Sequence, residues 1–356
     1  MENNKWLQEM ALTHPLVIAG PCSAETEEQV LKIAHQLKKT DATIFRAGVW
    51  KPRTRPGNFE GIGAIALPWL QRVKKETGLL IAVEVANANH VKLALEYDVD
   101  ILWIGARTTV NPFAVQEIAD ALANTEKIVL VKNPINPDLE LWIGAIERLQ
   151  KVGIKNLGAI HRGFSTYRKT KYRNNPKWQI PIDFKNRMPN IPMICDPSHI
   201  CGEREGLFDV SQTALDLQFD GLMIETHFNP DKAWSDAKQQ ITPSRLNEIT
   251  EELSVRKSKF EGDESKKELE KLRNQINLID HKILDILASR MEVAKKIGIE
   301  KKKQNVAVLQ QGRWNEIIEK SVKKGTDLGL SINFVEKFYK AIHQESIKHQ
   351  EKVLKN

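Results

Sequence analysis

The sequence predicts an α/β protein in which a parallel (β/α)8 barrel precedes an all-helical domain. Eight short apolar runs, rich in β-branched residues, are spaced along the first 227 residues, and amphipathic stretches follow most of them. This alternation is typical of a parallel sheet built from βα units. Eight such units in about 250 residues match the size of a (β/α)8 barrel. From about Ser265 onward the apolar residues follow a helical period without a strand pattern.

Almost every apolar run ends in a charged or metal-binding residue. In chain order the runs are LVIAG before Cys22, TIFRAG before Lys51, LIAVEV with Glu84, LWIG before Arg107, IVLV before Lys132, LGAI before His161 and Arg162, MICD before His199, and LMIE with Glu225. The helices between them are expected at residues 25–39, 61–77, 89–97, 112–124, 138–152, 203–218 and 244–254. Residues 165–190 are expected to form a long loop with a short helix. In such a barrel the carboxyl ends of the strands carry the active site, so we expect the chemistry there.

The chain is expected to divide into a barrel at residues 1–253, a polar linker at 254–264 and a helical domain at 265–356. The linker prediction depends on a charged segment with a single Phe. Apolar residues then recur at alternating steps of three and four from Leu269 to Ile286, which predicts one long helix over 265–303. Further helices are expected over 310–324 and from Ile332 to near the end.

Composition favours a soluble, cytoplasmic enzyme that binds small anions. No stretch reaches the 18 or more apolar residues of a membrane span, and no signal-peptide segment is present. The three cysteines have no paired spacing, which argues against a disulfide framework. The net charge of +7 could attract nucleic acid, acidic lipid or small anions. Because many basic residues follow strands, we favour small anions and expect no nucleic-acid or membrane partner.

Four residues could bind a metal ion at the barrel mouth. They are Cys22 after the first strand, His199 after the seventh, and Glu225 and Asp236 at and after the eighth. A thiol, an imidazole and two carboxylates together suit a divalent transition metal. Taken singly, each is more often a core or surface residue, so the spacing leaves both interpretations open.

Six basic residues also fall at strand ends. They are Arg46, Lys51, Arg53, Arg107, Lys132 and Arg162. Burying several cations in one mouth costs several kcal/mol per ion unless anions bind there. Some of them could instead pair with Glu84 and Asp196. For the group as a whole, phosphates and carboxylates are the expected ligands.

The motifs AGPCS, RAGxxKPRT, GART, VKN, HRG, DPSH, ETH and SD resemble, in order, those of the type I 3-deoxy-D-arabino-heptulosonate 7-phosphate (DAHP) synthases. The resemblance covers about residues 14–240. It implies a divalent metal ion, with manganese expected, at Cys22, His199, Glu225 and Asp236. It implies phosphoenolpyruvate at Arg46, Lys51, Arg107, Lys132 and Arg162, and erythrose 4-phosphate at Lys51, Pro52, Arg53 and Thr54. We also place Glu84 among the substrate-binding residues. The segments VKNPINP and HRGFSTY depart from the commonest patterns of the family.

The reaction implied is the attack of the phosphoenolpyruvate methylene carbon on the aldehyde of erythrose 4-phosphate. The metal would polarise the aldehyde, the cations would position the substrates, and Lys51 is the candidate proton donor to the forming alkoxide. A 3-deoxyoctulosonate 8-phosphate synthase is the alternative, because it shares the barrel and phosphoenolpyruvate. Its sugar-loop motif has Asn and Ala in place of Pro52 and Arg53, so the motif here favours the four-carbon sugar.

Polar residues interrupt the apolar phases of the helical domain. Arg290 stands four residues after Ile286, and Lys301 lies within about 20° of Arg290 around the same helix. Ser346 and Gln350 continue the apolar stripe of the last helix. A solvated helix end, or a coiled-coil dimer with a polar registry residue, would explain this pattern without an active site.

The pattern LxxLRxxIxxID, LAxR, K and SxxxQ resembles the all-helical chorismate mutases over about residues 265–353. It implies conversion of chorismate to prephenate without a metal, by Arg273, Arg290, Lys301, Arg313, Ser346 and Gln350. It also implies a homodimer through these helices, in which Arg273 serves the site of the other chain. The family often has Asp three residues before Arg313 and Glu directly after it, where this chain has Gln310 and Trp314. The missing glutamate bears on recognition of the substrate hydroxyl.

Together these observations predict a bifunctional transferase and isomerase. We expect the helical domain to regulate the barrel as well. The alternative is that the helical domain is a sensor without catalysis.

Overall fold

The computed structural model describes residues 5–52, 57, 59–167, 170–257 and 262–355. The chain divides into two compact units, Met1–Ser258 and Lys259–Asn356. None of the helices in these described stretches is long and apolar enough to cross a membrane.

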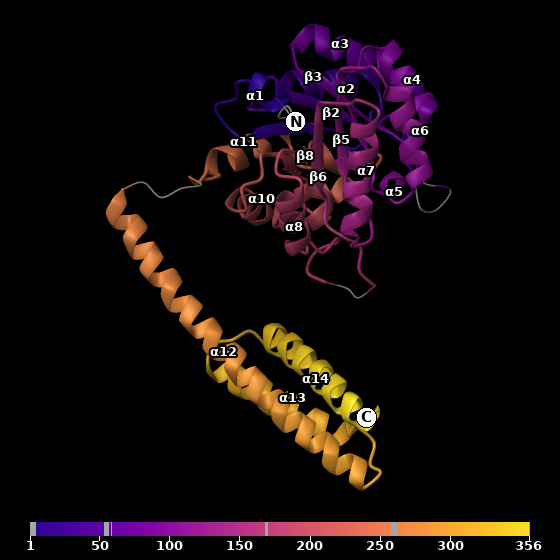
Figure 1. Cartoon of the computed structure of the whole chain (residues 1–356). Helices are drawn as coiled ribbons and strands as arrows, with labels where there is room; N and C mark the ends of the chain where they lie inside the picture. Colours follow the sequence, from indigo (N-terminus) through magenta and orange to yellow (C-terminus); the bar gives the residue numbers. More distant parts are fainter. Residues whose placement is uncertain (1–4, 53–56, 58, 168–169, 258–261, 356) are drawn as a thin grey trace. The chain divides into compact units, whose positions relative to one another are not determined.

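The first unit is a closed parallel barrel whose strands follow one another in chain order (Figure 1). The strands are β1 (Leu16–Gly20), β2 (Ile44–Ala47), β3 (Leu80–Val85), β4 (Ile101–Ile104), β5 (Ile128–Lys132), β6 (Leu157–His161), β7 (Met193–Cys195) and β8 (Gly221–Glu225). Pairing of β1 with β8 closes the barrel and sets Gly20 beside Glu225. The predicted barrel is therefore confirmed, and each apolar run lies at a strand.

Helices surround the strands of the barrel (Figure 1). They are α2 (Glu27–Leu37), α3 (Leu67–Thr77) with the 3-10 turn η1 (Gly63–Ala66) before it, α4 (Ala88–Glu96), α5 (Ala106–Thr109), α6 (Pro112–Leu122), α7 (Leu139–Lys151), α8 (Gln179–Arg187), α9 (Pro197–Cys201), α10 (Leu207–Asp216) and α11 (Pro243–Glu252), with 3-10 turns η2 (Pro230–Lys232) and η3 (Ala237–Gln239) after β8. Several begin at a side-chain cap: Thr26, Asn87, Asn111 and Asp138 each accept a hydrogen bond from a backbone N–H of the first turn. Within residues 165–190, α8 is the short helix expected there.

A short helix closes the amino-terminal end of the barrel. Trp6 of α1 (Trp6–Glu9) is buried, and its indole N–H donates to the carbonyl oxygen of Leu157, the first residue of β6, at 2.9 Å. Trp6 joins the cluster inside the strands, which includes Ile18, Trp103 and Met223. The barrel interior is therefore packed with side chains, so any site must lie at an end of the strands.

The second unit contains α12 (Asp263–Lys303), α13 (Gln311–Asp327) and α14 (Ile332–Lys355) among its described residues. Helix α14 packs against both others, and Gly298 permits its approach, because a Cβ there would lie 3.1 Å from the Gln350 Cα. The apolar seam lies on one helix, as predicted. Much of it is exposed in the single chain, at Leu272, Ile276, Ile279, Ile283 and Ile286.

Candidate active sites

Charged side chains converge at the carboxyl-terminal end of the barrel strands. Arg46, at 1% exposure, and Glu225, at 0%, are both buried. Arg46 Nη1 donates to Glu225 Oε1 at 2.6 Å, and Gln239 Nε2 donates to Glu225 Oε2 at 2.6 Å. Burial alone would raise the pKa of Glu225, but His199 and Arg46 lower it to about 2. Glu225 is therefore an ionised carboxylate in a dry environment.

The four predicted metal ligands lie at this mouth as two close pairs. Cys22 Sγ lies 3.4 Å from Asp236 Oδ2, and His199 Nε2 lies 3.9 Å from Glu225 Oε1. Asp196 Oδ2 lies 2.8 Å from His199 Nδ1, which is how an outer carboxylate orients a metal-bound histidine. In the part of the chain that the structure describes, three or more such side chains are nowhere grouped tightly enough to hold an ion.

Two cations occupy the space around these ligands. Lys51 Nζ donates to the carbonyl oxygen of Cys22 at 2.7 Å and to its Sγ at 3.0 Å. Arg46 Nη2 also reaches the Cys22 carbonyl, at 3.4 Å. The donor set still fits a divalent transition ion, because thiol, imidazole and carboxylate groups share one mouth and Asp196 orients the imidazole.

Lys132 and Arg162 bring two further buried cations to the mouth. Lys132 Nζ donates to Asp196 Oδ2 at 2.7 Å. Arg162 Nη1 donates to Asn174 Oδ1 at 2.7 Å, and burial lowers the pKa of its guanidinium to about 10. Asn133 Oδ1 accepts from the backbone N–H of Arg162 at 2.7 Å. Asn133 belongs to the VKN motif, which could have drawn attention to it, whereas Asn174 and Gln239 carry no sequence signal.

The remaining predicted barrel residues lie around the same mouth or outside the described residues. Glu84 Oε2 accepts from the Trp103 indole at 3.2 Å, and a Cβ at Gly105 would overlap the Glu84 carboxylate. Arg107 is exposed on α5, directly after β4. Lys51 and Pro52 are described, but Arg53 and Thr54 lie outside the described residues.

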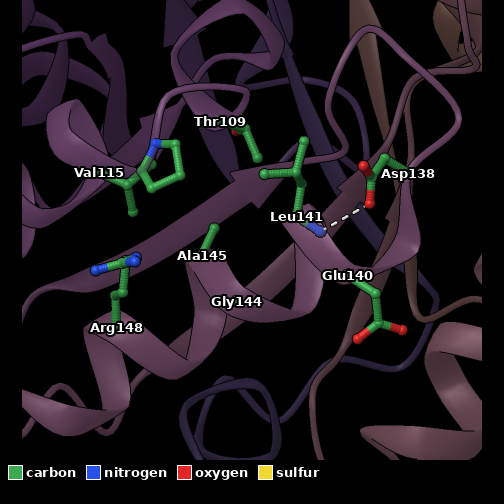
Figure 2. A pocket seen from close by; sticks show the side chains of 9 residues that line it. Thr109, Val115, Asp138, Glu140, Leu141, Gly144, Ala145 and Arg148 are labelled. Carbon is green, nitrogen blue, oxygen red and sulfur yellow. Dashed lines mark hydrogen bonds between the residues drawn. The ribbon is translucent and has the colours of Figure 1, made fainter.

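A separate pocket of about 350 Å³ lies between α6 and α7, away from the predicted residues (Figure 2). Its lining includes Val115, Leu141 and Arg148. Thr109 at its edge donates to the carbonyl oxygens of Gly105 and of Lys132, at 3.1 and 2.9 Å. None of the residues predicted for catalysis or binding lines this pocket, so the chemistry lies at the barrel mouth instead.

Polar residues of the second unit line one cavity of about 440 Å³. Those predicted from the sequence are Arg290, Lys301, Arg313, Ser346 and Gln350. Arg290 Nη1 donates to Ser346 Oγ at 2.5 Å, and Lys301 Nζ donates to the Val308 carbonyl oxygen at 2.5 Å. The Oε1 atom of Gln350 is buried without a hydrogen-bond partner among the described residues. This orphaned acceptor faces a cationic cavity, as a binding site for a small anion requires.

Arg273 is not among the residues that line this cavity. It is exposed on α12, where its Nη1 lies 3.9 Å from Glu270 Oε2. The structure therefore brings together all the predicted residues of this unit except Arg273.

Family comparisons divide the chain in the same way. Residues 12–260 match the DAHP synthetase I family, and residues 272–351 match chorismate mutase type II. The phospho-2-dehydro-3-deoxyheptonate aldolase of Thermotoga maritima is 29% identical over 237 residues, which cover 67% of this chain and 68% of that protein. The 2-dehydro-3-deoxyphosphooctonate aldolase of Desulfatibacillum aliphaticivorans is 28% identical over 68% of this chain and 92% of its own length.

Solved structures resemble the barrel unit. The crystal structure of phospho-2-dehydro-3-deoxyheptonate aldolase from Thermotoga maritima aligns with a TM-score of 0.60 and 28% identity, covering 67% of this chain and 68% of that one. A truncated DAHP synthase from Thermotoga maritima aligns with a TM-score of 0.58 and 26% identity, covering 67% and 85% of the two chains.

Proposed function

This chain belongs to the DAHP synthetase I family, and on that premise we propose that its barrel condenses phosphoenolpyruvate with erythrose 4-phosphate to give DAHP and phosphate. The observation that carries the proposal is the buried cluster of Arg46, Lys132 and Arg162 at the mouth, with Asp196 and Glu225 beside it. Cations buried at this cost are suited to an anionic substrate that completes their neutralisation.

Phosphoenolpyruvate would occupy the side of the mouth formed by Lys132, Arg162 and Arg107. Arg162 has the strongest requirement for an anion, because its guanidinium is buried and its side-chain contact is the neutral amide of Asn174. A phosphate or carboxylate would offset the desolvation that lowers its pKa. Arg46 would orient the carboxylate end while it keeps Glu225 in place. These contacts hold the substrate in a near-attack position.

A divalent ion, manganese in our proposal, would be held by Cys22, His199, Glu225 and Asp236. When bound it supplies Lewis-acid polarisation of the sugar aldehyde. The support is the mixed donor set and the contact of Asp196 with His199 Nδ1, which leaves Nε2 directed at Glu225.

Lys51 would donate the proton to the alkoxide that forms as the new carbon–carbon bond closes. Its ammonium lies at the Cys22 end of the mouth, 2.7 Å from the Cys22 carbonyl oxygen, and it begins the segment that we assign to the sugar. Pro52, Arg53 and Thr54 would complete the erythrose 4-phosphate site, and Glu84 would line the substrate mouth.

The octulosonate relatives leave a second substrate to be tested. Their identity to this chain is close to that of the Thermotoga maritima protein. The experiment is to supply phosphoenolpyruvate with either erythrose 4-phosphate or arabinose 5-phosphate, with and without chelator, and to measure phosphate release. We expect release with erythrose 4-phosphate and its loss with chelator. Preference for arabinose 5-phosphate would reassign the barrel.

We propose that the second unit rearranges chorismate to prephenate in the cavity between its helices. This pericyclic reaction needs no nucleophile, so catalysis consists of conformational restraint and positive charge near the breaking ether bond. Arg290 and Arg313 would hold carboxylates, and Lys301 with Gln350 would contact the ether oxygen. A non-catalytic sensor is the alternative, and a mutase assay of the whole chain decides between them.

A second copy of the chain would complete this cavity. The apolar residues of α12 from Leu272 to Ile286 are exposed in the single chain, and a contiguous apolar surface of this kind marks an interface. Arg273 stands on the same stretch of helix and does not line the cavity of its own chain. We infer a homodimer through α12, in which Arg273 enters the site of the other copy. We also propose that occupation of this site by prephenate inhibits the barrel.

A further inference from the structure

An aromatic pair lines the cavity of the second unit. The indole of Trp314 on α13 stacks on the imidazole of His343 on α14, with ring centroids 4.0 Å apart and planes inclined by 16°. Both side chains line the cavity that Arg290 and Lys301 also line. Trp314 directly follows Arg313, at the position where the resembled mutases often have glutamate. The cavity therefore has a stacked heteroaromatic pair at a place where an acid was expected.

The groups that face His343 keep its imidazole neutral. Helix α12 presents Arg290 and Lys301, α13 presents Arg313, and its own helix α14 presents Ser346 and Gln350. Burial lowers the pKa of His343, and the charges of Arg290 and Lys301 lower it further. A neutral imidazole has one nitrogen that donates and one that accepts. Its Nε2 is buried and lacks a hydrogen-bond partner within the described residues.

The chemistry of chorismate leaves one group without an assigned partner. The substrate has two carboxylates, an ether oxygen and one ring hydroxyl. The cations match the carboxylates, and Lys301 with Gln350 match the ether oxygen. Ser346 is already engaged, because its Oγ accepts from Arg290 and donates to the Ile342 carbonyl oxygen at 2.8 Å. The ring hydroxyl is neutral, and it both donates and accepts, as His343 does.

We propose that His343 recognises the ring hydroxyl of chorismate, and that Trp314 positions the imidazole for this contact. The inference rests on the proposed mutase activity of this unit. His343 is the specificity-determining residue, and Trp314 is a positioning residue that acts through it. A neutral pair recognises the hydroxyl without adding a negative charge beside a substrate that carries two of its own.

The test compares chorismate with 4-deoxychorismate, which lacks the ring hydroxyl, in the whole chain. We expect kcat/KM for chorismate to exceed that for the analogue by about 10- to 100-fold, because the imidazole is left unpaired by the analogue. His343→Leu should reduce the value for chorismate to about that for the analogue and change the analogue's value less than about twofold. His343→Gln keeps a donor and an acceptor, so it should retain part of the preference.

Trp314 is tested by the same preference. Trp314→Ala should reduce it by freeing the imidazole, whereas Trp314→Phe retains an aromatic face and should keep most of it. His349→Leu is the matched control, because His349 lies on the same helix, pairs with Glu345 at 3.4 Å and does not line the cavity. Thermal unfolding of each variant checks that the helices remain folded.

An equal loss for both substrates in His343→Leu would mean that His343 only packs the cavity, and would overturn the inference. An unchanged preference in that variant would overturn it as well. Conversion of chorismate by the whole chain without any preference for the hydroxyl overturns this inference and leaves the mutase function intact. A whole chain that neither binds nor converts chorismate overturns the mutase function, and this inference with it.

Discussion

The ammonium of Lys51 lies 3.0 Å from the thiol sulfur of Cys22. One residue is our proposed proton donor and the other is a proposed metal ligand, so a single contact joins the two parts of the synthase site. Burial raises the pKa of the Cys22 thiol to about 12, with Glu225 raising it and Lys51 opposing it. Cys22 is therefore a protonated thiol in the metal-free protein, and an ion must displace this proton to bind sulfur.

The first prediction follows from that proton. We expect chelator to abolish DAHP formation and manganese to restore it. Metal affinity should rise about tenfold per pH unit between pH 6 and 8, because below its pKa the thiol releases one proton for each ion bound. Titration calorimetry in buffers of different ionisation enthalpy measures this proton. Cys22→Ala should lose the metal-dependent activity while mutase activity persists. Full synthase activity in metal-stripped protein would contradict the assignment.

The second prediction concerns Arg290, whose guanidinium donates to Ser346. Arg290→Ala should lower mutase turnover by at least about 100-fold, because a charge-assisted contact made in the transition state is lost. The measurement is chorismate consumption by the whole chain. DAHP formation is the internal control and should not change. Unchanged chorismate turnover in this variant would show that the cavity is not the mutase site.

The third prediction uses the separation of Arg273 from that cavity. Arg273→Ala alone should be about as inactive as Arg290→Ala. In a dimer with one variant of each kind, one site would lose both arginines and the other would keep both. Unfolding and refolding an equal mixture should therefore recover about a quarter of the wild-type mutase activity, from the statistics of random pairing. Recovery of no activity would mean that Arg273 acts within its own chain or has no catalytic role.

Sequence reasoning identified the barrel because each strand is a compact apolar run that ends in a chemically distinct residue. It missed α1, because a four-residue helix has no measurable period, and the burial of Trp6 depends on where the other strands place Leu157. It found the charged residues of the mouth, whereas Asn174 and Gln239 act through contacts that only the folded loops create.

The stacked pair of the second unit shows the same limit. Trp314 was visible as a departure from a motif, but His343 was not, because its role depends on how α13 packs on α14. The pairing of the metal ligands into two sets could not be read from spacing either. It results from Lys51 and Arg46, which bind the same oxygen and sulfur atoms from the neighbouring strand and loop.

The fourth prediction concerns His161, which is buried at the end of β6 among Trp142, Trp178 and Phe219. Burial lowers the pKa of His161 to about 3, from an ordinary value of 6.5, and Arg162 adds to this effect. The unfolded chain therefore binds a proton below pH 6.5 that the folded barrel refuses until about pH 3. Stability is fully present above pH 6.5 and is lost as the pH falls between those values.

From pH 7 to pH 5 this single group should reduce the free energy of unfolding by about 2 kcal/mol. His161→Phe keeps a ring in the cluster and should remove that share of the pH dependence. Denaturant unfolding of both proteins at the two pH values provides the comparison. If the variant loses as much stability as the wild type between pH 7 and pH 5, then His161 is protonated in the folded barrel.

The last prediction concerns coupling between the two units. The mutase product reports on consumption further along the pathway that the synthase begins, so prephenate bound in the cavity should inhibit DAHP formation. By linkage, the synthase substrates should weaken prephenate binding to the same degree, with a coupling of about 1–3 kcal/mol, or about 5- to 150-fold in affinity. DAHP formation is measured with and without prephenate in three proteins. These are the whole chain, Arg290→Ala, and a chain ending at Lys257, which keeps the ion pair of Arg256 with Asp216. Only the whole chain should respond, because the variant lacks the cation that holds the ligand and the shortened chain lacks the cavity. Equal inhibition in all three would place the effector site on the barrel, and the absence of inhibition in the whole chain would remove the regulatory role of the helical unit.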